Sequence, residues 1–211
     1  MMKITSTLIW PILVAVAWFA PAFASAQNDA KFHMELDYAY HLGLTEKLSG
    51  YNYKSEGKLG GHALTLNALY NLKPNMTVGA GFGLSRFKRE YNGDSFTMPL
   101  YATFRYRPLA SHLPFYAFTD VGCTLFNRDE NHNFTGGLMG TIGAGYQLML
   151  KRHFGLNFKV GYNIQQFANT PIYNNNIEKR NEDGTIVYTS TLYDKRSLWR
   201  HSIQLGVGLV F

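Results

Sequence analysis

Hydrophobic and polar residues alternate along this chain with a period of two. In residues 31–44 the apolar positions run in steps of two from Phe32 to Leu44, and the positions between them are mostly polar or small. Side chains of a β-strand point alternately to its two faces, whereas an amphipathic helix places its apolar residues three and four positions apart. The segment therefore predicts a strand with one apolar and one polar face.

Seven further segments show the same alternation, and turn residues bound each of them. They span about residues 61–72, 76–88, 96–107, 115–125, 138–150, 154–165 and 199–211. Pro99 lies inside one of them, where its missing amide proton predicts a bulge or a strand end. For residues 115–125 we choose the register that directs Asp120 to the polar face and Val121, Cys123 and Leu125 to the apolar face. The pattern predicts eight strands.

The connections between these strands alternate in length. Residues 73–75, 108–113 and 151–153 are short connections, whereas 45–60, 89–95, 126–137 and 167–197 are mostly longer. Barrels of the bacterial outer membrane have short periplasmic turns and longer extracellular loops, so we expect both termini on the periplasmic side. Asp183-Gly184 predicts a hairpin turn within the longest loop. A barrel of ten strands is the alternative to one of eight, but it would place the charged residues of 178–183 at the depth of the bilayer.

The two ends of the chain add targeting features. Lys3 precedes an uncharged stretch over residues 4–19, and Ala24-Ser25-Ala26 offers a cleavage site, so we expect a signal peptide at 1–26 and a barrel domain at 27–211. No later segment has the roughly 20 apolar residues of a membrane helix, but barrel strands cross with only about 9–11. The last strand presents one apolar face, formed by Leu205, Val207, Leu209 and Phe211.

This ending resembles the C-terminal strand of bacterial outer-membrane barrels, whose terminal aromatic residue is recognised by the barrel-assembly machinery. Together with the eight alternating segments, it makes residues 31–211 similar to the small outer-membrane barrels of the OmpA/OmpX type. The resemblance implies an all-β, eight-stranded antiparallel up-and-down transmembrane barrel in the outer membrane of a Gram-negative bacterium. We expect a monomer whose partners are outer-membrane lipid and the assembly machinery, and the mildly basic charge of the chain suits contact with anionic lipopolysaccharide. We expect no peptidoglycan-binding domain.

The polar faces of the predicted strands carry charged residues of both signs. An eight-stranded barrel is just wide enough for side chains to fill it, and a buried charge is costly unless it is paired. We therefore expect an interior charge network that closes the lumen, and a gated polar path for ions or small solutes is the alternative. Inward glycines would either make room for long basic side chains or leave water-filled gaps. The predicted network comprises Lys31, Glu35, Asp37, Arg105, Arg107, Asp120, Lys159 and Arg200.

Catalysis, metal binding and nucleic-acid binding have little support in the sequence. Residues 83–87 lack the final glycine of a G-x-S-x-G nucleophile elbow, and Ser202 adjoins His201 on the opposite face of a strand. The single Cys123 excludes an intramolecular disulfide and a thiolate metal site. The formal charge of +6 comes from scattered basic residues rather than from a cluster. We expect no catalytic residues, no cofactor, no metal and no nucleic-acid partner. The candidate bases are His33, His41, His62, His112, His132, His153 and His201.

The loops at 45–60 and 167–197 are the remaining candidates for function. They mix tyrosine and phenylalanine with asparagine and charged residues, a composition that suits contacts with proteins or glycans on a rigid scaffold. The same residues would also form the aromatic girdle and a solvated loop surface. We expect a non-enzymatic envelope-structural role, or surface recognition and adhesion of a host or surface ligand. A narrow pore is the first alternative, and a lipid-modifying enzyme of the outer membrane is the second.

Overall fold

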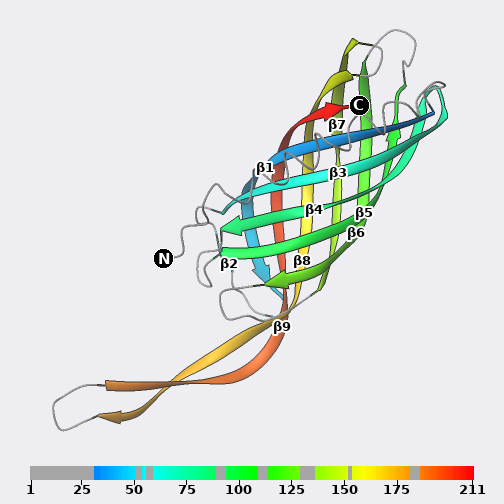
Figure 1. Ribbon diagram of the computed structural model, residues 1–211. Coiled ribbons are helices and arrows are strands. Elements are labelled where there is room, and N and C mark those ends of the chain that lie inside the picture. The colour runs from blue at the N-terminus through cyan, green and yellow to red at the C-terminus, as the bar shows by residue number, and fades with distance from the viewer. Residues whose placement is uncertain are drawn as a thin grey trace.

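The computed structural model describes residues 31–50, 54–55, 59–88, 94–108, 114–128, 136–151, 154–180 and 186–211. Each of eight strands pairs antiparallel with the next, and the last pairs with the first, so that the sheet closes into a barrel (Figure 1). The barrel strands are β1 (Phe32–Leu48), β3 (Gly60–Lys73), β4 (Met76–Lys88), β5 (Asp94–Tyr106), β6 (Phe115–Arg128), β7 (Gly137–Lys151), β8 (Phe154–Arg180) and β9 (Ile186–Val210). The predicted count of eight strands is confirmed.

The short strand β2 (Lys54–Ser55) is not part of the barrel wall. It pairs only with Glu46 and Lys47 of β1. The expected signal peptide at 1–26 and the predicted Asp183-Gly184 turn lie outside the described residues. No helix in the described part of the chain is long and apolar enough to cross a membrane.

The pairing register sets the stagger of the barrel. Following directly paired residues once around the wall from Glu35 leads back to Glu46, eleven residues further along β1. One of the eleven is the extra residue of a bulge between Gly43 and Thr45. A stagger of about ten residues over eight strands tilts them by roughly 40–45° and leaves an interior that side chains can fill.

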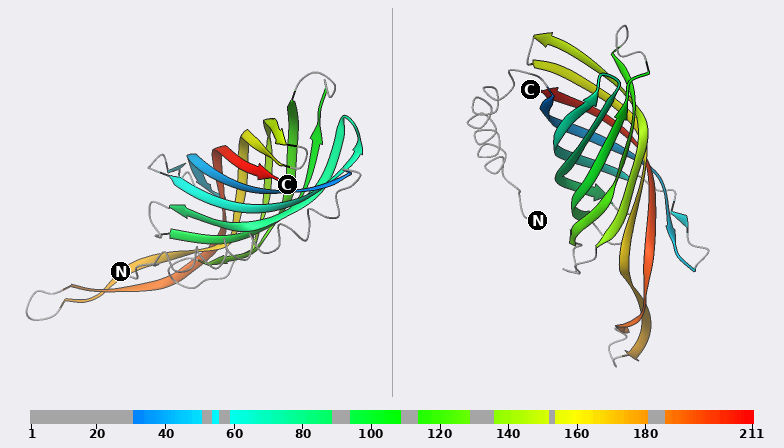
Figure 2. Two further views of the ribbon diagram at one scale, coloured as in Figure 1. Left: turned by 45° about the horizontal axis from the view of Figure 1, so that its top comes forward. Right: turned by 90° about the vertical axis from the view of Figure 1, so that its right-hand side faces the viewer.

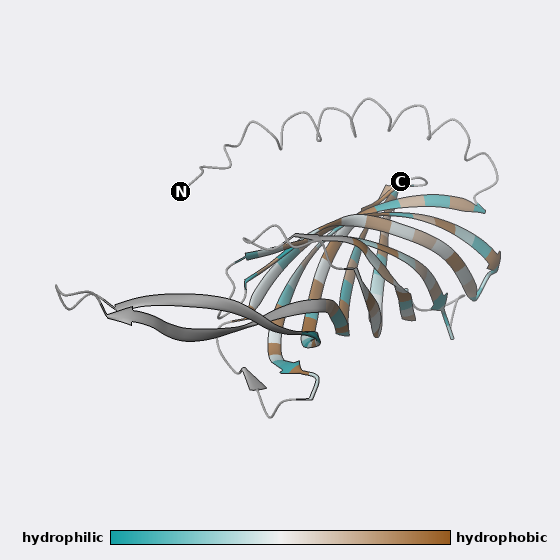
Figure 3. Cartoon of the chain, turned by 90° about the horizontal axis from the view of Figure 1, so that it is seen from below, coloured by the Kyte–Doolittle hydropathy of each residue, from teal (hydrophilic) through white to brown (hydrophobic). Residues whose placement is uncertain are grey.

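The barrel has an inverted distribution of polar and apolar side chains. Polar and charged residues outnumber hydrophobic ones among the buried side chains of the described chain, whereas large apolar side chains are exposed on every barrel strand. The alternation of hydrophilic and hydrophobic positions along the strands is visible in Figure 3. Water-soluble proteins rarely expose contiguous apolar surface on this scale, so the outer wall requires an apolar environment.

Strands β8 and β9 continue well past the barrel wall. Their pairing runs from Thr170 opposite Arg196 to Arg180 opposite Ile186, and the paired strands project away from the barrel (Figures 1 and 2). We call residues 170–180 and 186–196 the β8–β9 ribbon. The predicted hairpin in this region is confirmed, but the description of 167–197 as a loop is wrong, because backbone pairing continues almost to the tip.

The other predicted boundaries need smaller corrections. The predicted loop at 45–60 is shorter, because β1 continues to Leu48 and β3 begins at Gly60. A bulge in the β5–β6 pairing lies between Met98 and Pro99, where the proline predicted an irregularity. In β6 the register chosen from the sequence is confirmed, since Asp120 is buried while Val121 and Leu125 are more than 60% exposed.

Candidate functional site in the barrel interior

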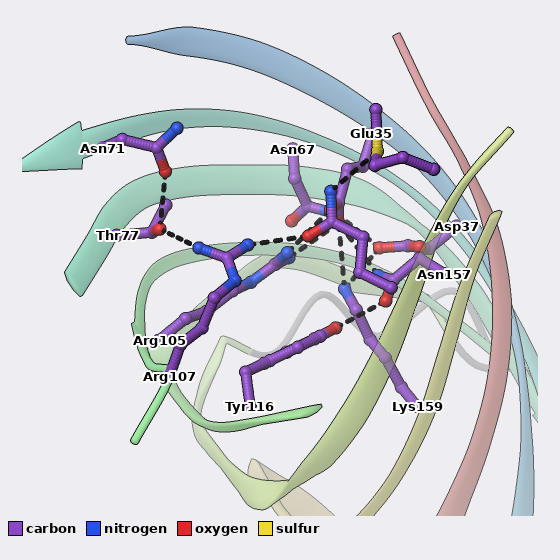
Figure 4. A network of polar contacts seen from close by, with 12 residues as sticks. Glu35, Asp37, Asn67, Asn71, Thr77, Arg105, Arg107, Tyr116, Asn157 and Lys159 are labelled. Atoms are coloured by element: carbon purple, nitrogen blue, oxygen red, sulfur yellow. Dashed lines mark hydrogen bonds and ion pairs between the residues drawn. The ribbon is translucent and has the colours of Figure 1, made fainter. Parts of the chain in front are cut away.

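The interior contains a cluster of paired charges near the barrel end at which β1 begins and β9 ends. We call Glu35, Asp37, Arg105 and Lys159 the Glu35 cluster (Figure 4). The guanidinium of Arg105 donates to both carboxylate oxygens of Glu35, each over 2.7 Å. Both side chains are at most 1% exposed. This two-pronged geometry is the strongest form of an ion pair between arginine and a carboxylate.

Lys159 on β8 links the two carboxylates of β1. Its Nζ lies 2.5 Å from Oδ2 of Asp37 and 3.5 Å from Oε2 of Glu35. Asn67 donates to the same Asp37 oxygen over 2.8 Å and accepts a hydrogen bond from Tyr101 over 2.7 Å. The two carboxylates and two basic groups therefore balance in charge and are held by neutral donors from several strands.

Tyr116 contacts the Glu35 cluster through Asn157 and Arg105. Its hydroxyl donates to Asn157 over 2.6 Å, and Asn157 donates to Glu35 over 3.1 Å. The Arg105 guanidinium lies 5.0 Å from the centre of the Tyr116 ring, within the range of a cation–π contact. A Cβ at Gly145 would collide with this ring, so the inward glycine makes room for a tyrosine.

A second cluster of side chains fills the lumen toward the barrel end at which the β8–β9 ribbon emerges. We call Arg200, Glu46, Phe87, Phe167 and Leu198 the Arg200 plug. Arg200 is fully buried, pairs with Glu46 over 3.1 Å and donates to the carbonyls of Lys88 and Gly60, also over 3.1 Å. Its guanidinium lies 4.7 Å from the centre of the Phe87 ring. Phe87, Phe167 and Leu198 pack into one buried apolar cluster.

A small cavity with a mixed polar and apolar lining lies between the Glu35 cluster and the Arg200 plug. It has a volume of about 30 Å³, and the residues that line it include His41, Ser85, Tyr101, Asp120 and Asn163. A water molecule needs roughly 10–15 Å³ of such space, so the chamber holds about two waters or a group of similar size. We call it the Asp120 chamber.

His41 and Ser202, which are far apart in the sequence, form a contact inside the barrel. His41 Nδ1 lies 3.3 Å from Ser202 Oγ, and Ser202 donates to Asn163 over 3.4 Å. The two residues are 161 positions apart, and only the closure of β1 against β9 brings them together. All three side chains are buried in the lumen, on the face opposite the apolar outer wall.

Two of the eight predicted network residues lie elsewhere. Lys31 precedes β1 and is exposed, because the strand begins one residue later, at Phe32. Arg107 follows β5 at the mouth of the barrel and is only partly buried. It donates to Thr77 over 2.8 Å and to Gln147 over 2.6 Å, so its partners are neutral groups and not the carboxylates expected.

The structure brings Glu35, Asp37, Arg105 and Lys159 into one cluster and places Arg200 in the other. Asp120 is buried but belongs to neither ion-pair group. Glu46 is not among the predicted network residues, because the predicted strand ends at Leu44. The bulge between Gly43 and Thr45 reverses the alternation beyond it and turns Glu46 inward.

The four residues of the predicted assembly motif lie along the end of β9. Leu205, Val207 and Leu209 are each more than 40% exposed on the outer wall. Phe211 exchanges two backbone hydrogen bonds with Met34, over 2.7 and 2.9 Å. The terminal residue therefore takes part in the seam that closes the barrel.

Metal-binding geometry is absent from the described residues, in which no group of three or more histidine, cysteine, aspartate or glutamate side chains could hold an ion. Cys123 is a free thiol on β6. It lies between the exposed Val121 and Leu125 in steps of two, and therefore on the same outer face.

Comparison with known proteins adds similarities of fold. No family model matches the chain, and no curated protein matches it. Among solved structures, Neisserial surface protein A is 12% identical, with a TM-score of 0.45 over 84% of this chain and 97% of its own. OprG of Pseudomonas aeruginosa is 16% identical, with a TM-score of 0.43 over 86% and 96%. Ail, the attachment invasion locus protein of Yersinia pestis, is 15% identical, with a TM-score of 0.45 over 85% and 97%. The assignment of an all-β, eight-stranded closed antiparallel barrel rests on this chain's own strand pairing, and its structural neighbours include small outer-membrane barrels.

Proposed function

We propose that the protein resides in the bacterial outer membrane, with both termini in the periplasm, and recognises a surface ligand through the β8–β9 ribbon. The observation that carries this proposal is the length of β8 and β9. They have 27 and 25 residues, whereas the other barrel strands have 13–17. A strand crosses a bilayer with about 9–11 residues, so both strands exceed what the membrane requires.

The register of the ribbon supports contact with a protein. Tyr173 pairs with Leu192 and Ile177 with Tyr188, so these positions share one face of the ribbon, with the pair of Asn175 and Ser190 between them. Asn174 pairs with Thr191, and Asn176 pairs with Thr189, on the opposite face. Tyrosine and large aliphatic residues are the types that supply most binding energy in protein interfaces, so the first face suits a protein surface.

The filled interior argues against the alternative of a narrow pore. The Glu35 cluster and the Arg200 plug occupy the lumen on either side of the Asp120 chamber. Moving an ion along this path would require separating buried ion pairs, at a cost of several kcal/mol each.

The third alternative, an enzyme acting on membrane lipid, needs a reactive group that lipid can reach. The His41–Ser202 pair lies in the lumen with both side chains at most 5% exposed. The outer wall separates this pair from the apolar surroundings of the barrel. The arrangement therefore supports a non-enzymatic role.

The proposal is tested by removing the ribbon while retaining the barrel. Residues 170–196 are replaced by an Asn-Gly turn, which leaves the wall pairs Gln165–Arg200 and Phe167–Leu198 in place. Bacteria that display the wild-type or the shortened protein are then compared for adherence to cultured epithelial cells. We expect the shortened protein to lose most adherence while it still migrates as a folded band on an unheated SDS gel.

Matched variants of the two ribbon faces sharpen this test. Tyr173→Ser with Tyr188→Ser changes the first face, and Asn174→Ser with Thr191→Ser changes the opposite face. We expect only the tyrosine pair to reduce adherence. Full adherence of a folded protein without the ribbon would rule out the proposed role.

A further inference from the structure

Asp120 differs from the other buried carboxylates of the lumen. Glu35, Asp37 and Glu46 each have a basic side chain within 4 Å. Among the described residues, none forms such a pair with Asp120, although its side chain is only 9% exposed. Lys159 and Arg105 act on it only from beyond ion-pair distance.

The neighbours of Asp120 are neutral oxygen-bearing groups. Thr103 and Thr141 lie directly opposite it on β5 and β7, and the buried Thr103 hydroxyl has no hydrogen-bond partner among the described residues. Thr141 accepts a hydrogen bond from Asn163 over 2.9 Å. A carboxylate can accept about four hydrogen bonds, so these neighbours leave the capacity of Asp120 unused.

The unused capacity of Asp120 faces an open space. Asp120 lines the chamber of about 30 Å³ together with the oxygen-bearing residues Thr65, Ser85, Tyr101 and Gln165, and the apolar Phe87, Pro99 and Met139 complete part of the lining. Oxygen ligands of this kind are those that alkali and alkaline-earth cations prefer. The chamber thus combines one negative charge, several neutral oxygens and room for a small occupant.

The charge balance of the lumen indicates the charge of that occupant. The Glu35 cluster contains two carboxylates and two basic groups, and the Arg200 plug contains one of each. Asp120 therefore adds to these two groups a single negative charge that has no basic side chain of the described residues within ion-pair distance. Arg107 does not offset this charge locally, because it lies at the mouth of the barrel, where it is partly exposed.

We propose that the Asp120 chamber binds one monovalent cation, of the size of sodium or potassium. A single positive charge neutralises Asp120, and the surrounding hydroxyl and amide oxygens complete its coordination. A divalent ion would overcompensate the one carboxylate, and calcium sites usually combine several carboxylates. This proposal does not depend on the surface role, because the chamber lies in the lumen and the ribbon outside it.

The direct test is crystallographic. The intact barrel domain is folded and crystallised with thallous ion as a heavy substitute for potassium, and an anomalous difference map is calculated. We expect one peak in the chamber beside the Asp120 carboxylate, and its loss in Asp120→Asn. A map of the folded wild type without a peak in the chamber would overturn the proposal and leave water or a proton as the occupant.

A second test measures stability in solution. The temperature at which the folded band disappears on SDS gels is compared in sodium chloride and in N-methylglucamine chloride at equal ionic strength. Ion binding at tenfold saturation should raise this temperature by about 3–6 °C in the wild type. Asp120→Asn should show no difference between the two salts.

Asp94→Asn is the matched control for this substitution. It also replaces an aspartate by an asparagine, but Asp94 pairs with Arg86 outside the lumen, where the arginine side chain is 58% exposed. This variant should keep the wild-type response to sodium. An equal sodium response in Asp120→Asn and the wild type would contradict the assignment of the site.

Discussion

Breaking the ion pair between Glu35 and Arg105 should be among the most destabilising single changes in the barrel. In Glu35→Met the guanidinium of Arg105, which is 1% exposed, loses both hydrogen bonds of 2.7 Å to the carboxylate. Its Nε already has no hydrogen-bond partner. Lys159 keeps Asp37 as its partner, so the unpaired charge falls mainly on Arg105. Leaving one charge of a buried pair uncompensated costs about 3–5 kcal/mol.

The assay is urea unfolding of the refolded barrel domain, followed by the fluorescence of Trp199. The other two tryptophans lie in the expected signal peptide, so this residue is the only tryptophan of residues 27–211. With a slope of about 2 kcal/mol/M, the predicted loss lowers the unfolding midpoint by about 1.5–2.5 M. The Glu35→Met/Arg105→Met double variant should be more stable than either single variant, because it leaves no lone charge.

The exposed pair of Arg86 and Asp94 provides the control. Its arginine side chain is 58% exposed, so Arg86→Met should cost less than about 1 kcal/mol. The reasoning fails if Glu35→Met costs no more than Arg86→Met, or if the double variant is as unstable as the sum of its two single changes.

Three further predictions follow from the packing of the lumen and the seam. Gly145→Ala should destabilise the barrel by about 1–3 kcal/mol in the same urea assay, because its Cβ would collide with the Tyr116 ring. Gly140→Ala should be tolerated, since its nearest neighbour would lie 3.9 Å away. The wild-type protein should give no steady conductance in planar lipid bilayers, and reproducible channel steps would show that the Arg200 plug does not close the lumen. Removing Phe211 should lower the yield of folded protein on unheated SDS gels, because the seam between β1 and β9 loses two backbone hydrogen bonds to Met34. An unchanged yield would argue against a role of Phe211 in closing the barrel.

The wall of the barrel could be predicted from the sequence because each strand has a period of two. Strand β4 was predicted with the bounds that the structure has, 76–88, because turn residues flank a clean alternation. The inward placement of Glu35, Arg105 and Lys159 follows from the same alternation. Burial of an alternate face is a property of one strand, so a local pattern suffices to predict it.

The pairing of interior side chains could not be predicted in this way. Glu35 and Arg105 are 70 residues apart, and their contact depends on the stagger of the whole barrel. A single bulged residue near Gly43 was enough to turn Glu46 inward, toward Arg200. Stagger and bulges leave little trace in local composition, so the partners had to come from the structure.

The β8–β9 ribbon was only partly predictable. Asp183-Gly184 indicated a hairpin, but the asparagine and threonine residues before and after it lack the apolar alternation of a membrane strand. Backbone pairing continues there, beyond the barrel wall, without the regular alternation that marks the membrane-spanning part of each strand. The sequence therefore indicated a loop where the strands extend.

The inside-out arrangement in a membrane is the central claim, and Cys123 offers the most direct measurement. A nitroxide spin label on this single cysteine, in protein inserted into lipid vesicles, reports its collisions with oxygen and with a water-soluble nickel chelate. Oxygen concentrates in lipid, so we predict a high ratio of oxygen to nickel accessibility at Cys123. A label on Thr124→Cys in a Cys123→Ser background should show low accessibility to both, because Thr124 is 3% exposed inside the barrel. A Cys123 label that collides more with the nickel chelate than with oxygen would contradict the membrane-facing wall.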